Sequence, residues 1–168
     1  MLLSIRSGII RYATAMTSSR VQFGVFVTAL WFTSNGPAAY LIYPEMFSRG
    51  MESTTTIVFG FIPVTLNYCH MLCHLITGLI GLVAVTRRSW AVVYALAGGT
   101  YYIAWGILGL AGGDHVRHHL GVDTFGSWVH VVEGTILFVV FIVHKMTAQD
   151  HRAGGRDARP HEAADARA

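Results

Sequence analysis

The amino-acid sequence predicts an all-α membrane protein, a bundle of four transmembrane helices. Only 12% of its 168 residues are charged and 53% are hydrophobic, whereas soluble domains carry about 25% charged residues. Four segments are apolar enough, and close enough to the required length of about 20 residues, to cross a bilayer. An aromatic content of 12% excludes a disordered chain. The small net charge of +3, with no basic stripe, argues against nucleic acid as a partner.

The four expected spans cover residues 21–43, 63–85, 90–111 and 126–144. The first span is the weakest, because Ser34-Asn35-Gly36-Pro37 interrupts it. Pro37 removes a backbone donor and should kink the helix, with a broken or re-entrant segment as the alternative. The spans together form one expected membrane domain, residues 21–145.

The segments that flank this domain differ from it in composition. Residues 1–20 contain three arginines and no acidic residue, which predicts an amphipathic helix at the membrane surface. A mitochondrial presequence is the alternative for this arm, because such presequences are also rich in Arg and poor in acid. Residues 146–168 mix Gly, Ala and charges of both signs, which is typical of a disordered tail.

The distribution of Lys and Arg predicts the orientation in the membrane. With four spans, one side of the membrane holds only Arg49 and Arg117. Because cytoplasmic loops carry an excess of basic residues, the richer side should be the cytoplasm. We therefore expect a multi-pass protein of the cell inner membrane with both termini cytoplasmic. The residues on the cytoplasmic side are Arg6, Arg11, Arg20, Arg87, Arg88, Lys145, Arg152, Arg156, Arg159 and Arg167.

Polar and small residues recur at helical spacing within the second, third and fourth expected spans. In the second span, Asn67, His70 and His74 share one face when each residue turns the helix by about 100°. Glycines share these faces, and small residues let helix backbones approach closely. The predicted packing positions are Gly78, Gly81, Gly98, Gly106, Gly109 and Gly134.

The intramembrane histidines form the most informative pattern, in a chain that has nine histidines. Imidazole and carboxylate groups are costly in lipid, so we expect them to face the bundle interior. Successive residues advance about 1.5 Å, which places four such groups in the outer leaflet and within about 10 Å of one another along the membrane normal. The sequence therefore predicts one inward-facing cluster of His70, His74, His130 and Glu133.

Three interpretations of this cluster remain open. The favoured one is structural: the groups hydrogen-bond one another, fix the helix register and bind no cofactor. The second is a haem b between two histidines, for which His70 and His130 are best matched in depth. The third is a transition-metal site or a proton relay in which His130 and Glu133 act with histidines of the adjacent loop. The loop histidines are His115, His118 and His119.

The run from Asn67 to Leu82 contains the pattern N-x-x-H-x-x-x-H-x-x-x-G. This pattern resembles the signature of a bacterial family of small four-helix membrane proteins, the domain of unknown function 4383. The Tyr- and Gly-rich third span and the closing segment, Asp123 followed by His130-x-x-x-Gly134, are similar to that family as well. The resemblance covers about residues 57–142 and does not extend to the first span. It implies the fold and adds no mechanism, because no activity is known for the family.

The sequence contains no phosphate-binding loop, nucleophile elbow or His-Glu-x-x-His motif. We therefore expect a non-enzymatic accessory or assembly subunit of a larger membrane complex. Its expected partners are the lipid bilayer and other membrane subunits or further copies of the chain. The alternative is a cytochrome-b-like or metal-binding electron-transfer subunit that uses His70, His74 and His130.

Overall fold

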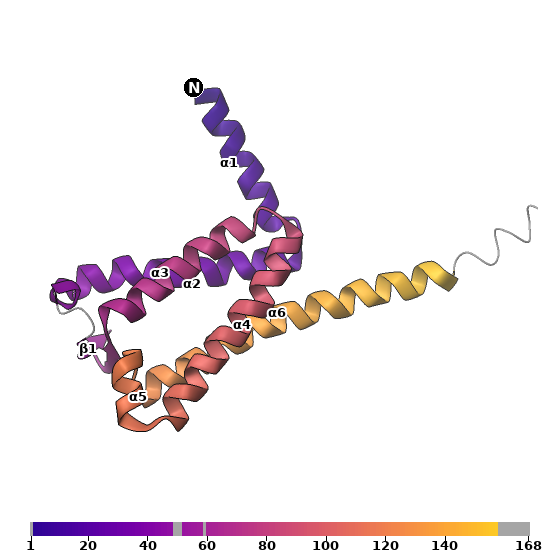
Figure 1. Cartoon of the computed structure of the whole chain (residues 1–168). Coiled ribbons are helices and arrows are strands. Elements are labelled where there is room, and N and C mark those ends of the chain that lie inside the picture. Colours follow the sequence, from indigo (N-terminus) through magenta and orange to yellow (C-terminus); the bar gives the residue numbers. More distant parts are fainter. Residues whose placement is uncertain (1, 49–51, 59, 158–168) are drawn as a thin grey trace, which may run out of the picture.

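The computed structural model describes residues 2–48, 52–58 and 60–157, and most of them are helical (Figure 1). Two of the helices, α2 and α3, lie side by side, as do α4 and α6 (Figure 1). In chain order the elements are α1 (Leu2–Thr17), α2 (Arg20–Ile42), the 3-10 helix η1 (Pro44–Ser48), β1 (Thr54–Val58), β2 (Ile62–Leu66), α3 (Tyr68–Ala84), α4 (Arg88–Ala111), α5 (Gly113–Leu120) and α6 (Thr124–Asp157).

Among the described residues, three helices are long and apolar enough to cross a membrane: Arg20–Ile42, Arg88–Ala111 and Thr124–Gln149. These helices mark the chain as a membrane protein. The fourth apolar helix, α3, has only 17 residues. At about 1.5 Å per residue it is about 25 Å long, which is shorter than the hydrocarbon core of about 30 Å. The expected bundle of four full spans is therefore not confirmed.

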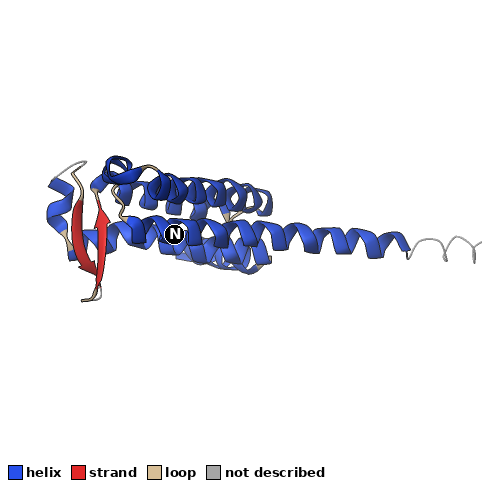
Figure 2. Cartoon of the chain, turned by 90° about the horizontal axis from the view of Figure 1, so that it is seen from below, coloured by secondary structure: helices blue, strands red, loops and turns tan. Residues whose placement is uncertain are grey.

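A β-hairpin occupies the place where the second span was expected to begin. β1 pairs antiparallel with β2, and Gly60 adopts a positive φ of 80° in the turn between the strands. The run of Thr and Ile in β1 favours a strand over a helix. The expectation of a helix from residue 63 is therefore wrong here, although the described chain is mostly helical as expected. Figure 2 shows the hairpin at one end of the helices.

Asn67 sets the true start of α3. Its side-chain Oδ1 accepts a hydrogen bond of 2.8 Å from the backbone N–H of His70, which is the N-cap arrangement that satisfies a free donor at a helix start. The sequence pattern placed Asn67 on the helix face, one turn before His70. In the structure it terminates the hairpin and begins the helix, so the histidines of α3 lie in its first two turns.

Helix α2 runs without interruption from Arg20 to Ile42, with Pro37 inside it. The alternative of a segment broken at Pro37 is therefore not observed. Gly36 is buried and faces Leu75 of α3. Pro37 cannot donate a backbone hydrogen bond to the helix. The residue before it, Gly36, packs closely on α3 at this point.

Glycines bring the paired helices into close contact. A Cβ added to Gly78 of α3 would lie 2.4 Å from the backbone nitrogen of Thr33 in α2. A Cβ on Gly106 of α4 would lie 2.6 Å from the carbonyl oxygen of Ser127 in α6. The other predicted packing positions also face neighbouring helices within van der Waals distance, namely Gly81, Gly98, Gly109 and Gly134.

Polar contacts join the helices at the end of the bundle away from the hairpin. The buried Gln22 side chain donates from Nε2 to the carbonyl oxygen of Val85, at 2.8 Å. The Tyr12 hydroxyl of α1 donates to the carbonyl oxygen of Leu82, also at 2.8 Å. Beyond this contact α1 projects steeply away from the bundle (Figure 1). The helix expected for residues 1–20 is therefore present and docked by its second half.

The end of α6 projects past the bundle on the side opposite the hairpin (Figure 2). Residues 146–157, which we expected to be disordered, continue this helix. Arg49 and residues 158–168, the rest of the expected tail, lie outside the described residues.

Substitution of Gly106 by Ala should lower the stability of the folded protein by about 1–3 kcal/mol, because the new methyl group would meet the backbone of α6. The control is Gly8→Ala in α1, where the methyl group would meet nothing within 4 Å. That control should be neutral or slightly stabilising, since Ala favours a helix by about 1 kcal/mol over Gly. Thermal unfolding in detergent measures both. Equal stability of the two variants would contradict close packing of α4 on α6.

Candidate metal centre

Three histidine side chains from two helices meet inside the bundle. The Nε2 atom of His70 lies 3.0 Å from Nε2 of His74 and 3.0 Å from Nε2 of His130. His70 and His74 are on consecutive turns of α3, and His130 comes from α6. Their exposed fractions are only 5%, 3% and 3%. The three facing nitrogens lie within 4.8 Å of one another, so we call these residues the histidine cluster.

The other ring nitrogen of two of these histidines has a partner that accepts a hydrogen bond. Nδ1 of His70 lies 2.6 Å from the carbonyl oxygen of Gly121, and a carbonyl oxygen can only accept. Nδ1 of His130 lies 3.1 Å from Oε2 of Glu133, and an ionised carboxylate also only accepts. Both rings therefore carry their proton on Nδ1. When these rings are neutral, their Nε2 lone pairs point at each other.

A chain of hydroxyl groups fixes the remaining ring, His74. Nδ1 of His74 lies 3.3 Å from the Tyr102 hydroxyl, which lies 2.6 Å from Oγ1 of Thr77. Thr77 donates its own proton to the carbonyl oxygen of Cys73, so it accepts from Tyr102. Tyr102 in turn accepts from Nδ1 of His74. All three histidines thus present a Nε2 lone pair to the centre of the cluster.

This arrangement fits a metal site. Facing lone pairs repel each other unless a cation lies among them, and metal-binding histidines usually donate their other N–H to a carbonyl or carboxylate. A zinc ion bound at 2.0–2.1 Å would hold its ligand nitrogens about 3.3 Å apart in a tetrahedral site. The two contacts of 3.0 Å in the cluster are close to that spacing. The donor set therefore fits a single transition metal ion.

Glu133 supports the cluster from outside it. One carboxylate oxygen accepts from Nδ1 of His130, and the other accepts from Nε1 of Trp31 in α2, at 2.7 Å. Glu133 is 7% exposed, and its two oxygens are directed at these donors. Glu133 is therefore placed to orient the His130 ring. The sequence pattern did not identify Trp31, although an indole N–H within an apolar span needs an acceptor.

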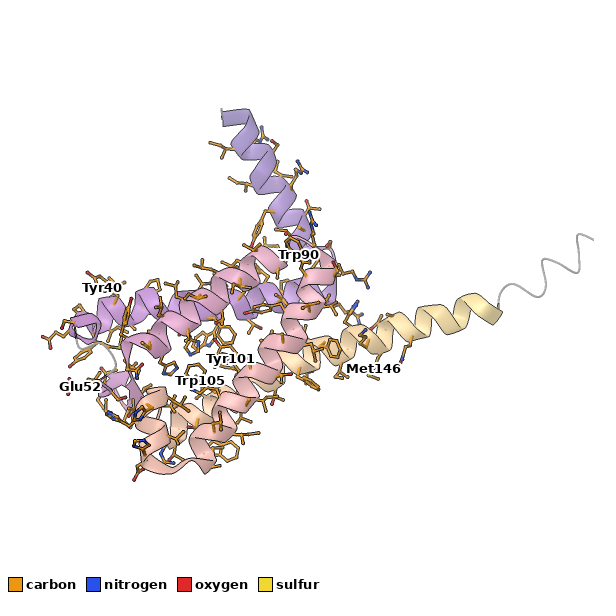
Figure 3. All side chains as sticks on the ribbon, in the orientation of Figure 1. Tyr40, Glu52, Trp90, Tyr101, Trp105 and Met146 are labelled. Carbon is orange, nitrogen blue, oxygen red and sulfur yellow. The ribbon has the colours of Figure 1, made fainter. Side chains whose placement is uncertain are left out.

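Aromatic rings of α4 and α2 cover one side of the cluster. The Tyr102 ring lies 5.4 Å from the His74 ring and 5.5 Å from the His130 ring, between centroids. The Trp105 ring lies 5.7 Å from those of both His70 and His130, and Phe32 of α2 stacks on Tyr102 at 4.3 Å. Figure 3 shows Trp105 and Tyr101 projecting from α4. No pattern in the sequence singles out Trp105 or Phe32.

The turn after α5 places the carbonyl group that holds His70. Gly121 ends α5 with a positive φ of 64°, a conformation that glycine adopts without strain. A Cβ at this position would lie 2.5 Å from the side chain of Asn67. Asp123 then joins the hairpin to α6, since its carboxylate accepts from the backbone N–H of Thr65 and of Gly126. The turn after α5 therefore contacts the cluster directly, and Asp123 links this turn to the hairpin and to α6.

The loop histidines do not join this cluster. His115, His118 and His119 lie on α5, where all three are exposed. His119 contacts the carbonyl oxygen of His115 one turn earlier. Across the part of the chain that the structure describes, the histidine cluster is the group of three or more His, Cys, Asp or Glu residues with metal-ligand spacing. The structure thus brings Glu133 to His130 rather than to the loop.

An apolar cavity of about 340 Å³ lies against the cluster. α2, the hairpin, α3 and the first turns of α6 form its walls. All three histidines and Glu133 line its surface. The cavity therefore gives the candidate metal centre a side that the aromatic rings of α4 do not cover.

A family model described as a domain of unknown function (DUF4383) matches residues 22–143, more than half of the chain. The chain belongs to this family. The match starts at the beginning of α2, so the expectation that the first span lies outside the resemblance is wrong. It also spans the whole candidate site, from Trp31 to Glu133. No curated protein and no solved structure matches the chain.

Proposed function

We propose that this family member is a multi-pass membrane protein that binds one transition metal ion through His70, His74 and His130. The observation that carries the proposal is the convergence of three Nε2 atoms whose rings donate elsewhere through Nδ1. Zinc is the first candidate, because it accepts three histidines and leaves a fourth tetrahedral position open. Copper, nickel and iron share its preference for imidazole.

Two other interpretations of the cluster have less support. A haem with two axial histidines places the porphyrin plane between them, whereas the rings of His70 and His130 lie 4.9 Å apart and edge to face. A purely structural cluster requires a proton between each pair of facing nitrogens. The acceptors at Nδ1 leave neutral rings without that proton. A metal ion satisfies all three lone pairs at once.

We further propose that α2, α3, α4 and α6 cross the inner membrane with both termini in the cytoplasm. α3 is antiparallel to α2 and packs along it, so α3 crosses the membrane together with α2. The hairpin between the two helices then lies at the outer surface. The basic residues Arg20, Arg87 and Arg88 lie at the opposite end, next to the joint formed by Gln22 and Val85. The metal centre then lies in the outer half of the membrane.

The role of accessory or assembly subunit, favoured by the sequence, stays a prediction. A metal centre is compatible with an accessory subunit. If the ion is redox-active, the alternative role of an electron-transfer subunit is also compatible with it. Both oxygens of Glu133 accept hydrogen bonds within the site. Because both oxygens are engaged, a role of Glu133 in holding the metal ligand His130 is favoured over a role as a general base.

The metal site predicts that the purified full chain, stripped of metal and titrated with Co²⁺, binds one equivalent and develops the visible absorption of a tetrahedral ion. His74→Ala should abolish this spectrum, because two ligands remain. The matched control His118→Ala should leave it unchanged, since His118 lies on the exposed face of α5. Absence of saturable binding, or an equal loss in both variants, would refute the assignment.

Glu133→Gln should weaken Co²⁺ binding by about 10- to 100-fold, the usual effect of removing a group that orients a metal-bound histidine. Glu45→Gln, at an exposed position of η1, is the control and should bind like the parent chain. Competition with a chelator of known affinity measures both. Unchanged affinity in Glu133→Gln would remove Glu133 from the metal centre.

The orientation predicts that a reporter fused at Ala168 is cytoplasmic and that one inserted after Asp114 in α5 is on the outer side. Enzymatic reporters that are active on only one side of the membrane give the answer for each. A periplasmic reporter at Ala168 would contradict the proposed orientation. It would also move the metal centre to the inner half of the membrane.

A further inference from the structure

We propose that the open position of the metal binds the carboxylate of a long-chain fatty acid whose alkyl chain fills the cavity beside the histidine cluster. The inference rests on the proposed function, because the metal supplies the positive charge that holds the carboxylate. It adds a ligand class and a path by which the ligand arrives from the bilayer.

The surroundings of the cluster decide where the open position points. The rings of Tyr102 and Trp105 contact the histidines from α4, and Phe32 of α2 stacks on Tyr102 and also contacts the His74 ring. The cavity lies against the same three histidines on the side of α2 and the hairpin. A fourth metal ligand therefore has space on the cavity side of the cluster. On the opposite side, the rings of α4 occupy the space.

The shape and the chemistry of the cavity fit an amphiphile with one chain. The histidine cluster and Glu133 supply the imidazole and carboxyl groups of its wall, and most of the remaining wall is apolar. A volume of about 340 Å³ lies at the lower end of the range of small-molecule sites, about 300–1,000 Å³. The apolar wall includes Ile42, Ile62, Val64, Leu66, Phe125 and Val129.

Exposed apolar residues line part of the cavity. Trp31 and Ile42 of α2 and Phe125 of α6 line the cavity, yet their exposed fractions are 52%, 57% and 52%. In the proposed orientation these residues face the outer leaflet. A fatty acid can then slide in from the lipid with its head group first, and its chain stays in apolar surroundings throughout.

The charge of the site selects the head group. A divalent ion held by three neutral histidines would bring positive charge to the cluster, beside the carboxyl group of Glu133 that contacts His130. The cluster is buried, and unbalanced charge is costly in such low-dielectric surroundings. A carboxylate balances positive charge, whereas an ester or an alcohol does not.

The test uses the full chain loaded with Co²⁺ in nanodiscs of zwitterionic phosphatidylcholine. Palmitate should shift the visible absorption bands of the ion and saturate at one equivalent, because a carboxylate replaces the fourth ligand. Methyl palmitate has the same chain without the charge and should leave the spectrum unchanged. Acetate at the same concentration has the charge without the chain and should also have no effect.

A variant of the cavity wall separates ligand binding from metal binding. Ala38 is an exposed residue of α2 that lines the cavity, so Ala38→Trp should fill part of it. This variant should keep the Co²⁺ spectrum and lose palmitate affinity by about tenfold or more, a change of about 1.4 kcal/mol. The control Ala104→Trp, on the exposed face of α4 away from the cavity, should bind palmitate like the parent chain.

The outcomes distinguish the two proposals. A Co²⁺ spectrum that palmitate does not change would overturn the fatty-acid site and leave the metal centre standing. An equal response to methyl palmitate or acetate, or unaltered affinity in Ala38→Trp, would also overturn it. Absence of the Co²⁺ spectrum itself would overturn the proposed function, and the carboxylate site with it.

Discussion

Three imidazole lone pairs that face one another inside an apolar bundle constrain most of this structure. Each ring is held by a different element: the turn after α5 accepts from His70, Tyr102 of α4 accepts from His74, and Glu133 of α6 accepts from His130. α2 contributes Trp31, which holds Glu133 from the other side. Every long helix of the bundle therefore takes part in orienting the cluster, and none does so alone.

The close approach of the helices and the polar cluster depend on each other. Buried polar groups without partners cost several kcal/mol in surroundings that lack water. Glycines such as Gly78 and Gly106 bring the backbones near enough for these short hydrogen bonds to form. In the proposed metal site, the facing lone pairs oppose folding until a cation binds. An ion present at 100 times its dissociation constant would stabilise the folded state by about 2.7 kcal/mol, so metal binding and stability are linked in this account.

Helical periodicity in the sequence was sufficient to predict α4, α6 and the shared face of His70 and His74, because side chains on a regular helix repeat at fixed angles. It failed at α3, where Pro63 lies in a strand and Asn67 caps the helix instead of joining its face. The carbonyl group of Gly121 could not be predicted, since a backbone contact leaves no pattern of side chains. Trp31 was missed because its partner lies on a helix far along the chain.

The most direct measurement of the central claim is X-ray absorption at the zinc edge of the full chain loaded with one equivalent of Zn²⁺. The account predicts three imidazole nitrogens at about 2.0–2.1 Å and one further light ligand. His74→Ala should lose one of those nitrogens. A shell of oxygen ligands without the scattering of imidazole rings, or an unchanged shell in His74→Ala, would contradict a metal centre in the histidine cluster.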